Sequence, residues 1–95
     1  MKGSAVRFRL YVSGDAHNST LAVANLREIC RSRLLHGCET EVVDVFKQPK
    51  RAFADGVLMT PTLIKLAPGT VTRIVGDLAD ARTVLDALGL EREAK

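Results

Sequence analysis

Hydrophobic and polar residues alternate at the start of the chain. From Val6 to Val12 every second residue is apolar, and Arg7, Arg9 and Tyr11 fall between them. A period of two is typical of a β-strand with one face in the core. A run from Glu39 to Phe46 is rich in β-branched residues and predicts a second strand.

Between these strands the pattern becomes helical. Apolar residues recur at steps of three and four from Ala22 to Leu34, which predicts an amphipathic helix. Asn18 or Ser19 is the candidate N-cap, and Gly37 is a plausible stop. Because a strand, a helix and a strand follow one another, we expect a right-handed parallel βαβ unit.

The next segment predicts a short helix and a hairpin. Pro49 fits the first turn of a helix that ends near Gly56. A third strand from Thr62 to Ala67 and a fourth from Val71 to Gly76 flank the turn residues Pro68-Gly69. We expect these two strands to pair antiparallel.

A final helix is expected from Leu78 to Leu88, with Asp77 as its N-cap and Gly89 as its stop. The complete order is βαβαββα, an α/β arrangement with a four-stranded mixed sheet. With Thr60-Pro61 before the third strand, this order resembles the minimal thioredoxin-like fold, which has two helices on one face of the sheet and one on the other. The face with Arg7, Arg9 and Tyr11 should lie under the single short helix, because polar residues tolerate partial cover.

Composition adds bounds to this fold. The chain has 95 residues, 46% of them hydrophobic, which predicts one domain over residues 1–95 with an ordered core at about 5–90. Its sequence has no apolar run long enough for a membrane span and no secretory segment, so a cytoplasmic location is expected. The net charge is +3, but the basic residues are scattered, and nucleic-acid binding is not expected.

The two cysteines, Cys30 and Cys38, have neither metal-site nor redox-pair spacing, and we expect both to be free thiols. Redox thioredoxins carry C-x-x-C directly after the first strand, where residues 13–18 of this chain contain no cysteine. The sequence therefore favours a protein without enzymatic activity, cofactor or metal. The alternative is a thioredoxin-like enzyme, either a thiol oxidoreductase that uses Cys38 or a glutathione-dependent oxidoreductase.

Several segments together resemble the KaiB family, the small partner proteins of the KaiC ATPase ring in bacterial clock systems. The matching residues are Leu10-Tyr11-Val12 with Gly14, Asn18-Ser19, Val43-Asp44-Val45, Lys47 with Pro49, Asp55, Thr60-Pro61-Thr62-Leu63 with Lys65, and Ile74 with Gly76-Asp77-Leu78. Their order and spacing cover nearly the whole chain. The resemblance implies a regulatory protein that docks on KaiC and can help to sequester a further clock component.

The resemblance also implies two folds: the thioredoxin-like one, which binds KaiC, and a tetrameric form with a different C-terminal half. KaiB proteins commonly carry glycine where this chain has Ala87, and alanine favours helix by roughly 0.5–1 kcal/mol. We therefore expect the thioredoxin-like fold to dominate in a mainly monomeric chain. By analogy the Thr60-Pro61 bond should be cis. The candidate fold-switch or structural residues are Thr60, Pro61, Thr62, Gly76, Asp77, Leu78, Ala87 and Gly89.

Lys65 and Arg73 match positions that are basic in KaiB and lie among those contacting KaiC. The short second helix and the hairpin would form the docking face. The chain differs from the family pattern at Leu21, usually arginine, and at Thr72, where one of two adjacent basic residues is replaced. The expected partner is therefore a KaiC-like ATPase or a related kinase.

Overall fold

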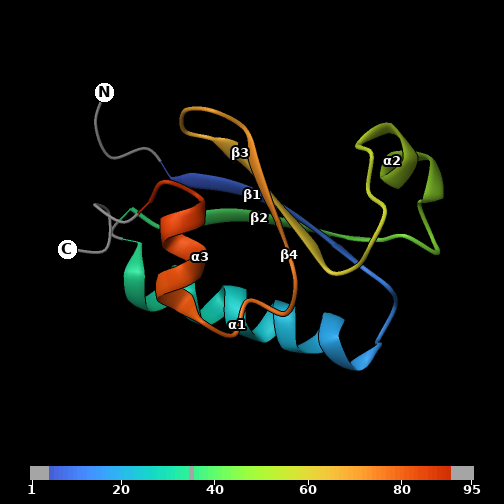
Figure 1. The fold of residues 1–95 in the computed structure, drawn as a ribbon, viewed down its shortest axis with the longest axis horizontal. Helices are drawn as coiled ribbons and strands as arrows, with labels where there is room; N and C mark the ends of the chain where they lie inside the picture. Colours follow the sequence, from blue (N-terminus) through green and yellow to red (C-terminus); the bar gives the residue numbers. More distant parts are fainter. Residues whose placement is uncertain (1–4, 35, 91–95) are drawn as a thin grey trace.

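The computed structural model describes residues 5–34 and 36–90, which form a mixed four-stranded sheet with helices on both faces (Figure 1). The elements are β1 (Val6–Val12), α1 (His17–Arg33), β2 (Cys38–Asp44), α2 (Pro49–Ala54), β3 (Thr62–Ala67), β4 (Thr72–Val75) and α3 (Ala81–Ala87). Their order is the predicted βαβαββα. Across the sheet the strands run β2-β1-β3-β4, with β1 and β2 parallel and the other two pairs antiparallel. The parallel βαβ unit and the antiparallel hairpin are thus confirmed.

The main core lies between the sheet and the two helices α1 and α3, which cover the same face. The alternating apolar residues of β1 pack there with Leu26 of α1 and Leu85 of α3. A smaller cluster on the other face joins Tyr11, Val43 and Ile64 to Ala52 of α2. Figure 1 shows α2 set apart from α1 and α3. The structure therefore confirms two helices on one face and the short helix over the face with Tyr11.

Helix α1 begins earlier than either predicted cap. Its N-cap is Ala16, and no side chain caps it. The amide of Ala16 donates to the carbonyl of Ser13, so a turn leads the chain into the helix. The Ser19 hydroxyl instead accepts from the Ser13 amide over 3.0 Å. Neither Asn18 nor Ser19 is the N-cap, because the turn has already set the helical direction before them.

The cysteine prediction was wrong. Cys30 and Cys38 form a disulfide, with 5.8 Å between their Cα atoms, within the usual range for such a bridge. Both are partly buried against the main core. The last turns of α1 and the start of β2 meet here because the chain reverses through Gly37, whose carbonyl accepts from the Val6 amide. The spacing of the two cysteines along the chain does not show that this reversal brings them within bonding distance.

The last helix, in contrast to α1, begins later than predicted. The expected helix was Leu78–Leu88 with Asp77 as the cap, whereas α3 spans Ala81–Ala87 and its N-cap is Asp80. The Asp80 carboxylate accepts from the Thr83 amide over 3.3 Å. Only Asp77 was predicted as the cap, but Asp80 also precedes apolar residues at helical spacing. Tertiary packing of the residues before Asp80 makes it the cap.

Leu78 explains this choice. It is buried in the main core, and its φ is 65°, in the left-handed region. A bulky residue with positive φ cannot belong to a right-handed helix. The Asp77 carboxylate accepts from the Ala79 amide, and the Asp77 carbonyl accepts from the Asn25 side-chain amide of α1. These bonds hold the segment between β4 and α3 as a turn.

Within the described part of the chain, no helix has the length and apolar character to cross a membrane.

Candidate protein-binding face

Hydroxyl groups, and no thiols, occupy the end of β1. The Ser13 and Thr60 hydroxyls are hydrogen-bonded to each other, and the Thr60-Pro61 bond is cis, as predicted. The Thr62 hydroxyl donates to the Met59 carbonyl over 2.5 Å. In the position where redox thioredoxins hold their cysteines, this chain therefore presents groups suited to holding loops together.

The disulfide lies at the opposite end of the sheet. Cys38 pairs with Val6 at the start of β1, whereas Thr62 pairs with Tyr11 near its end. At about 3.3 Å per residue, these positions are roughly 17 Å apart. Among the described residues, no group of three or more histidine, cysteine, aspartate or glutamate side chains is placed to hold a metal ion.

A buried tyrosine fastens α2 to the sheet. The Tyr11 side chain is fully buried, and its hydroxyl lies 2.5 Å from Asp55 Oδ2 and 3.0 Å from the Arg51 carbonyl oxygen. Arg9 Nη1 donates to the same Asp55 oxygen over 3.0 Å. The bonds from Tyr11 and then Arg9 lower the pKa of Asp55, while burial and the bond to Asp55 raise the pKa of Tyr11. Asp55 is the C-cap residue of α2, so the end of that helix is tied to the central strand.

A second carboxylate joins β2 to α2. Glu41 accepts from Arg51 Nη1 and Nη2 over 2.6 and 2.8 Å, and from Arg9 Nε over 3.1 Å. These bonds, first those from Arg51 and then that from Arg9, lower the pKa of Glu41 to about 2. Its side chain is 46% exposed, so solvent screens much of the attraction. Together with Asp55 and Tyr11, these residues form the anchor network of α2.

Arg73 of β4 extends along the same face. It pairs with Ile64, and directly opposite residues of an antiparallel pair point to the same side of the sheet. Arg73 Nη2 donates to the Asp55 carbonyl over 2.7 Å. Its exposed guanidinium therefore lies beside the end of α2.

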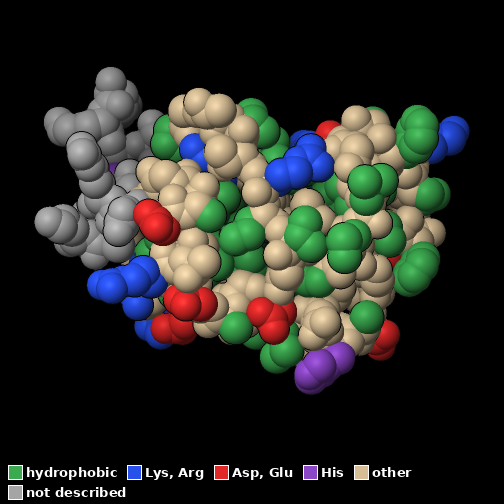
Figure 2. Space-filling model, in the orientation of Figure 1, with side chains coloured by type: hydrophobic (Ala, Val, Ile, Leu, Met, Phe, Trp, Pro, Cys, Tyr) green, Lys and Arg blue, Asp and Glu red, His purple; other side chains and the backbone are tan. Residues whose placement is uncertain are grey.

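Apolar side chains gather around α2 and remain open to solvent. Phe53 lies on the helix and is 87% exposed, and Leu58, four residues past the end of the helix, is 94% exposed. We define the α2 patch by five exposed apolar residues in this helix, in the segments before and after it, and on β4: Phe46, Phe53, Leu58, Met59 and Val75. Figure 2 shows hydrophobic side chains concentrated on the half of the molecule that carries α2. Clusters of this kind typically mark surfaces that bind other proteins.

Lys65 lies on the other face of the sheet. It follows Ile64 in β3, so it points toward α3, and it is only 5% exposed. Its ammonium group donates to the Pro68 carbonyl. The structure therefore separates Lys65 and Arg73, which the sequence had grouped as one contact pair.

The candidate switch residues lie at the connections of the C-terminal half. The Gly76 amide donates to the Pro61 carbonyl over 3.0 Å, which joins the two loops at one end of the sheet. Gly76 and Gly89 both have positive φ, of 132° and 72°, a conformation that favours glycine. Ala87 is the last residue of α3 and is exposed. Glycine there would thus loosen a helix end and disturb no core contact.

A family model of the KaiB domain matches residues 9–90 of the chain. The chain belongs to the KaiB family. It is 38% identical over 91 residues to the circadian clock protein KaiB3 of Synechocystis sp., across 96% of this chain and 87% of that protein. It is 45% identical over 82 residues to the circadian clock oscillator protein KaiB of Synechococcus sp., across 86% and 74% of the two chains. The KaiB family is one of clock regulatory proteins.

Solved structures agree with the fold of this KaiB-family chain. The N-terminal domain of Synechococcus elongatus SasA matches with a TM-score of 0.74 and 23% identity, over 90% of this chain and 85% of that one. Mitochondrial thioredoxin 3 of Saccharomyces cerevisiae matches with a TM-score of 0.70 and 16% identity, over 94% and 79%. The fold is therefore thioredoxin-like, as predicted.

The sequence did not reveal the anchor network. Arg9 and Tyr11 were expected under the short helix, but Glu41, Arg51 and Asp55 were not assigned to them. One signal was available: β1 and the short helix carry only basic charges and β2 carries only acidic ones, and these elements meet on one face. Without the register, however, no particular pair could be chosen.

Proposed function

We propose that this KaiB-family chain is a regulatory protein of a clock system that binds a KaiC-type ATPase through the α2 patch and Arg73. It acts by binding and catalyses no reaction. The observation that carries the proposal is an exposed apolar patch that includes Phe53 of α2, a helix that the anchor network holds in place. The proposal places the chain in the cytoplasm, where ATP is available to such a partner.

The composition of the face suits a protein partner. Aromatic residues, methionine and arginine are enriched at protein interfaces, and Phe53, Met59 and Arg73 supply one of each. The anchor network preorganises α2, so little ordering is needed on binding. Because Arg73 is basic, we expect acidic side chains at the matching point of the partner. The departures at Leu21 and Thr72 keep a related kinase as the second candidate partner.

We further propose that the thioredoxin-like arrangement dominates in solution and that the chain is mainly monomeric, with a tetramer as the alternative state. Asp80 caps α3 and Leu78 anchors the preceding turn in the core, so several contacts support the C-terminal half in this arrangement. Thr60, Pro61, Thr62 and Gly76 would be the points at which that half rearranges.

The binding test uses biolayer interferometry of the full chain against a purified KaiC-type ATPase with ATP present. Phe53→Ser should weaken binding at least tenfold, because central apolar residues dominate interfaces. Val42→Ser is the matched control: Val42 is also exposed, but it pairs with Leu10 and thus faces α1. Equal losses from both variants, or no binding of the wild type to any KaiC-type ATPase or kinase, would refute the proposal.

Arg73→Glu should slow association several-fold with a weaker salt dependence, since exposed interface charges act mainly on the on-rate. Arg27→Glu, at an exposed position of α1, is the control. Lys65→Met, with its folding checked by circular dichroism, tests whether the opposite face contributes. An effect of the folded variant as large as that of Arg73→Glu would move the interface toward α3.

The oxidoreductase alternative has its own test. An insulin-reduction assay of the wild type and of Cys38→Ser should give no turnover above background in either. Activity that requires Cys38 would overturn the proposal that the chain acts by binding alone.

A further inference from the structure

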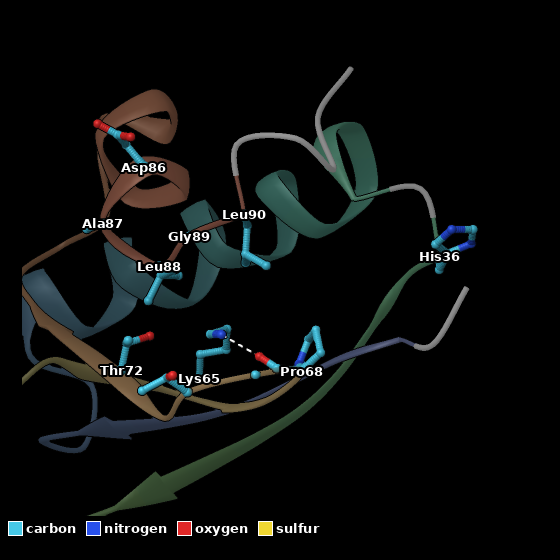
Figure 3. A pocket seen from close by; sticks show the side chains of 11 residues that line it. His36, Lys65, Pro68, Thr72, Asp86, Ala87, Leu88, Gly89 and Leu90 are labelled. Carbon is cyan, nitrogen blue, oxygen red and sulfur yellow. Dashed lines mark hydrogen bonds between the residues drawn. The ribbon is translucent and has the colours of Figure 1, made fainter. Parts of the chain in front are cut away.

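A cavity of about 670 Å³ lies between the end of α3 and the β3–β4 hairpin (Figure 3). Its volume falls within the range of small-molecule sites. The residues of the α2 patch do not line it, and it opens on the opposite face of the sheet. It is therefore a separate feature from the proposed ATPase interface.

Lys65 forms the floor of this cavity. In Figure 3 its side chain rises from β3 toward α3, and the residue is 95% buried, since only 5% is exposed. A lysine ammonium has three donors; here one bonds to the Pro68 carbonyl. Among the described residues Lys65 makes no ion pair. Asp86 lines the same cavity but does not form an ion pair with Lys65. A buried cation that no carboxylate contacts directly is costly, so an anion bound at Lys65 would be stabilised.

Thr72 supplies a second polar group on the same wall. It pairs directly with Lys65 across the hairpin, and both line the cavity. The Thr72 hydroxyl is buried and has no hydrogen-bond partner among the described residues. Two adjacent donors with unused capacity match the two oxygens of a carboxylate.

The roof is apolar. Leu88 and Leu90 lie above the floor in Figure 3, and Pro68 closes one side. Asp86 also lines the cavity, and its negative charge disfavours a doubly charged phosphate more than a singly charged carboxylate. Leu88 and Leu90 also belong to the main core, where they are 2% and 3% exposed. The lining fits a ligand that has an apolar body and one negative charge.

We propose that this cavity binds a small organic acid, whose carboxylate accepts hydrogen bonds from Lys65 and Thr72 and whose apolar body packs against Leu88 and Leu90. Charge-assisted hydrogen bonds of this kind are among the strong ones. The site is independent of the α2 patch, so occupancy and ATPase binding can be measured separately.

The test is a ¹H–¹⁵N NMR titration of the full chain with octanoate, octanol and octyl phosphate. Octanoate should shift the amides of Lys65, Thr72 and Leu88 in a saturable way. Octanol, which has the same tail but no charge, and octyl phosphate should bind at least tenfold more weakly. Equal affinity for octanoate and octanol, or octanoate shifts confined to other parts of the molecule, would overturn the proposal.

Variants then test the two donors. Lys65→Met keeps an apolar stem and should weaken octanoate binding at least tenfold, and Thr72→Val should weaken it about threefold, the change expected for one modest hydrogen bond. Lys47→Met, at an exposed position outside the cavity, should bind as the wild type does. If Lys65→Met does not fold, the comparison of octanoate with octanol on the wild type decides. Unchanged binding by folded Lys65→Met would refute the site.

Discussion

The Tyr11 hydroxyl donates a hydrogen bond to Asp55 Oδ2 over 2.5 Å. This bond joins the second-last residue of the central strand β1 to the C-cap of α2. It lies beneath a helix of only six residues, too short to be stable alone. The position of the α2 patch thus depends on a contact with the sheet.

Tyr11→Phe should lower the free energy of unfolding by about 1–2 kcal/mol, because the ring still fills the core but Asp55 loses its buried donor. Urea denaturation measures this loss. In a double-mutant cycle, Tyr11→Phe with Asp55→Ala should cost clearly less than the sum of the two single changes. Simple additivity would show that the two groups do not interact.

Acid should weaken the attachment of α2. The pKa values of Glu41 and Asp55 are lowered in the folded state, Glu41 to about 2. Between the folded and the unfolded values, the unfolded chain binds more protons, so stability is fully present above about pH 4.5 and falls as the pH drops toward 2. Urea midpoints from pH 2 to 7 measure it.

Glu41→Gln should flatten this acid slope and lower the stability at pH 7 by less than about 1 kcal/mol, because the Glu41 side chain is half-exposed. A slope as steep as that of the wild type would assign the acid sensitivity to other carboxyls.

Reduction should destabilise the chain. The Cys30–Cys38 bridge spans eight residues, for which the chain-entropy model gives about 2.5 kcal/mol. The urea midpoint should therefore fall with dithiothreitol, and the double variant Cys30→Ala/Cys38→Ala should not respond to it. Two thiols that titrate in the folded, unreduced protein would contradict the bridge. In a cytoplasm rich in glutathione, such a bond is exposed to reduction.

At position 78 a glycine variant should be at least as stable as an alanine variant, the reverse of the usual order. Leu78→Ala loses a buried side chain, which costs about 2–4 kcal/mol. Leu78→Gly loses the same packing but relieves the strain of a positive φ, worth about 1 kcal/mol. The glycine variant should thus be at least as stable as the alanine variant in urea denaturation. A glycine variant that is clearly weaker would place Leu78 outside the left-handed region.

Ala87→Gly should have a small effect. Since Ala87 ends α3, the cost should be near the low end of the usual glycine penalty, about 0.5 kcal/mol. Ala24→Gly, at an exposed position within α1, should cost about 1 kcal/mol. If two folds are in balance, Ala87→Gly should also raise the tetramer fraction in sizing experiments. Each of the four chains loses about 0.5 kcal/mol from the monomeric fold, which is about 2 kcal/mol per tetramer, or roughly 30-fold in the association constant. No change in oligomer distribution, with the expected loss in stability, would argue against a role for Ala87 in that balance.

Alternation and helical spacing predicted the first strand and the two longer helices, since burial of one face imposes its period on the residues. The other elements were predicted from β-branched residues and from proline and glycine at their ends. Boundaries were harder where two residues could serve one purpose: Asp77 and Asp80 both precede apolar helical positions, and the burial of Leu78 decided between them. The disulfide could not be found from spacing, because a reversal at Gly37 brings Cys30 and Cys38 together.

The two basic residues of the hairpin show another limit. Because β3 is a central strand, Leu63, Ile64 and Lys65 are all buried, and the sequence does not indicate which face each one occupies. Only the pairing of Ile64 with Arg73 separates Arg73 from Lys65. The family resemblance grouped these residues by position along the chain, which does not specify the side of the sheet.

That pairing sets which positive charge is displayed outward. If β4 slipped by one residue against β3, all of its side chains would exchange faces: Arg73 would join Lys65 above the sheet, and two like charges would meet beside α3. Ile74, packed against the main core, would be expelled into water by the same slip. Burial of Ile74 therefore fixes the register of the hairpin, which keeps the Lys65 ammonium buried and leaves the Arg73 guanidinium exposed to a partner.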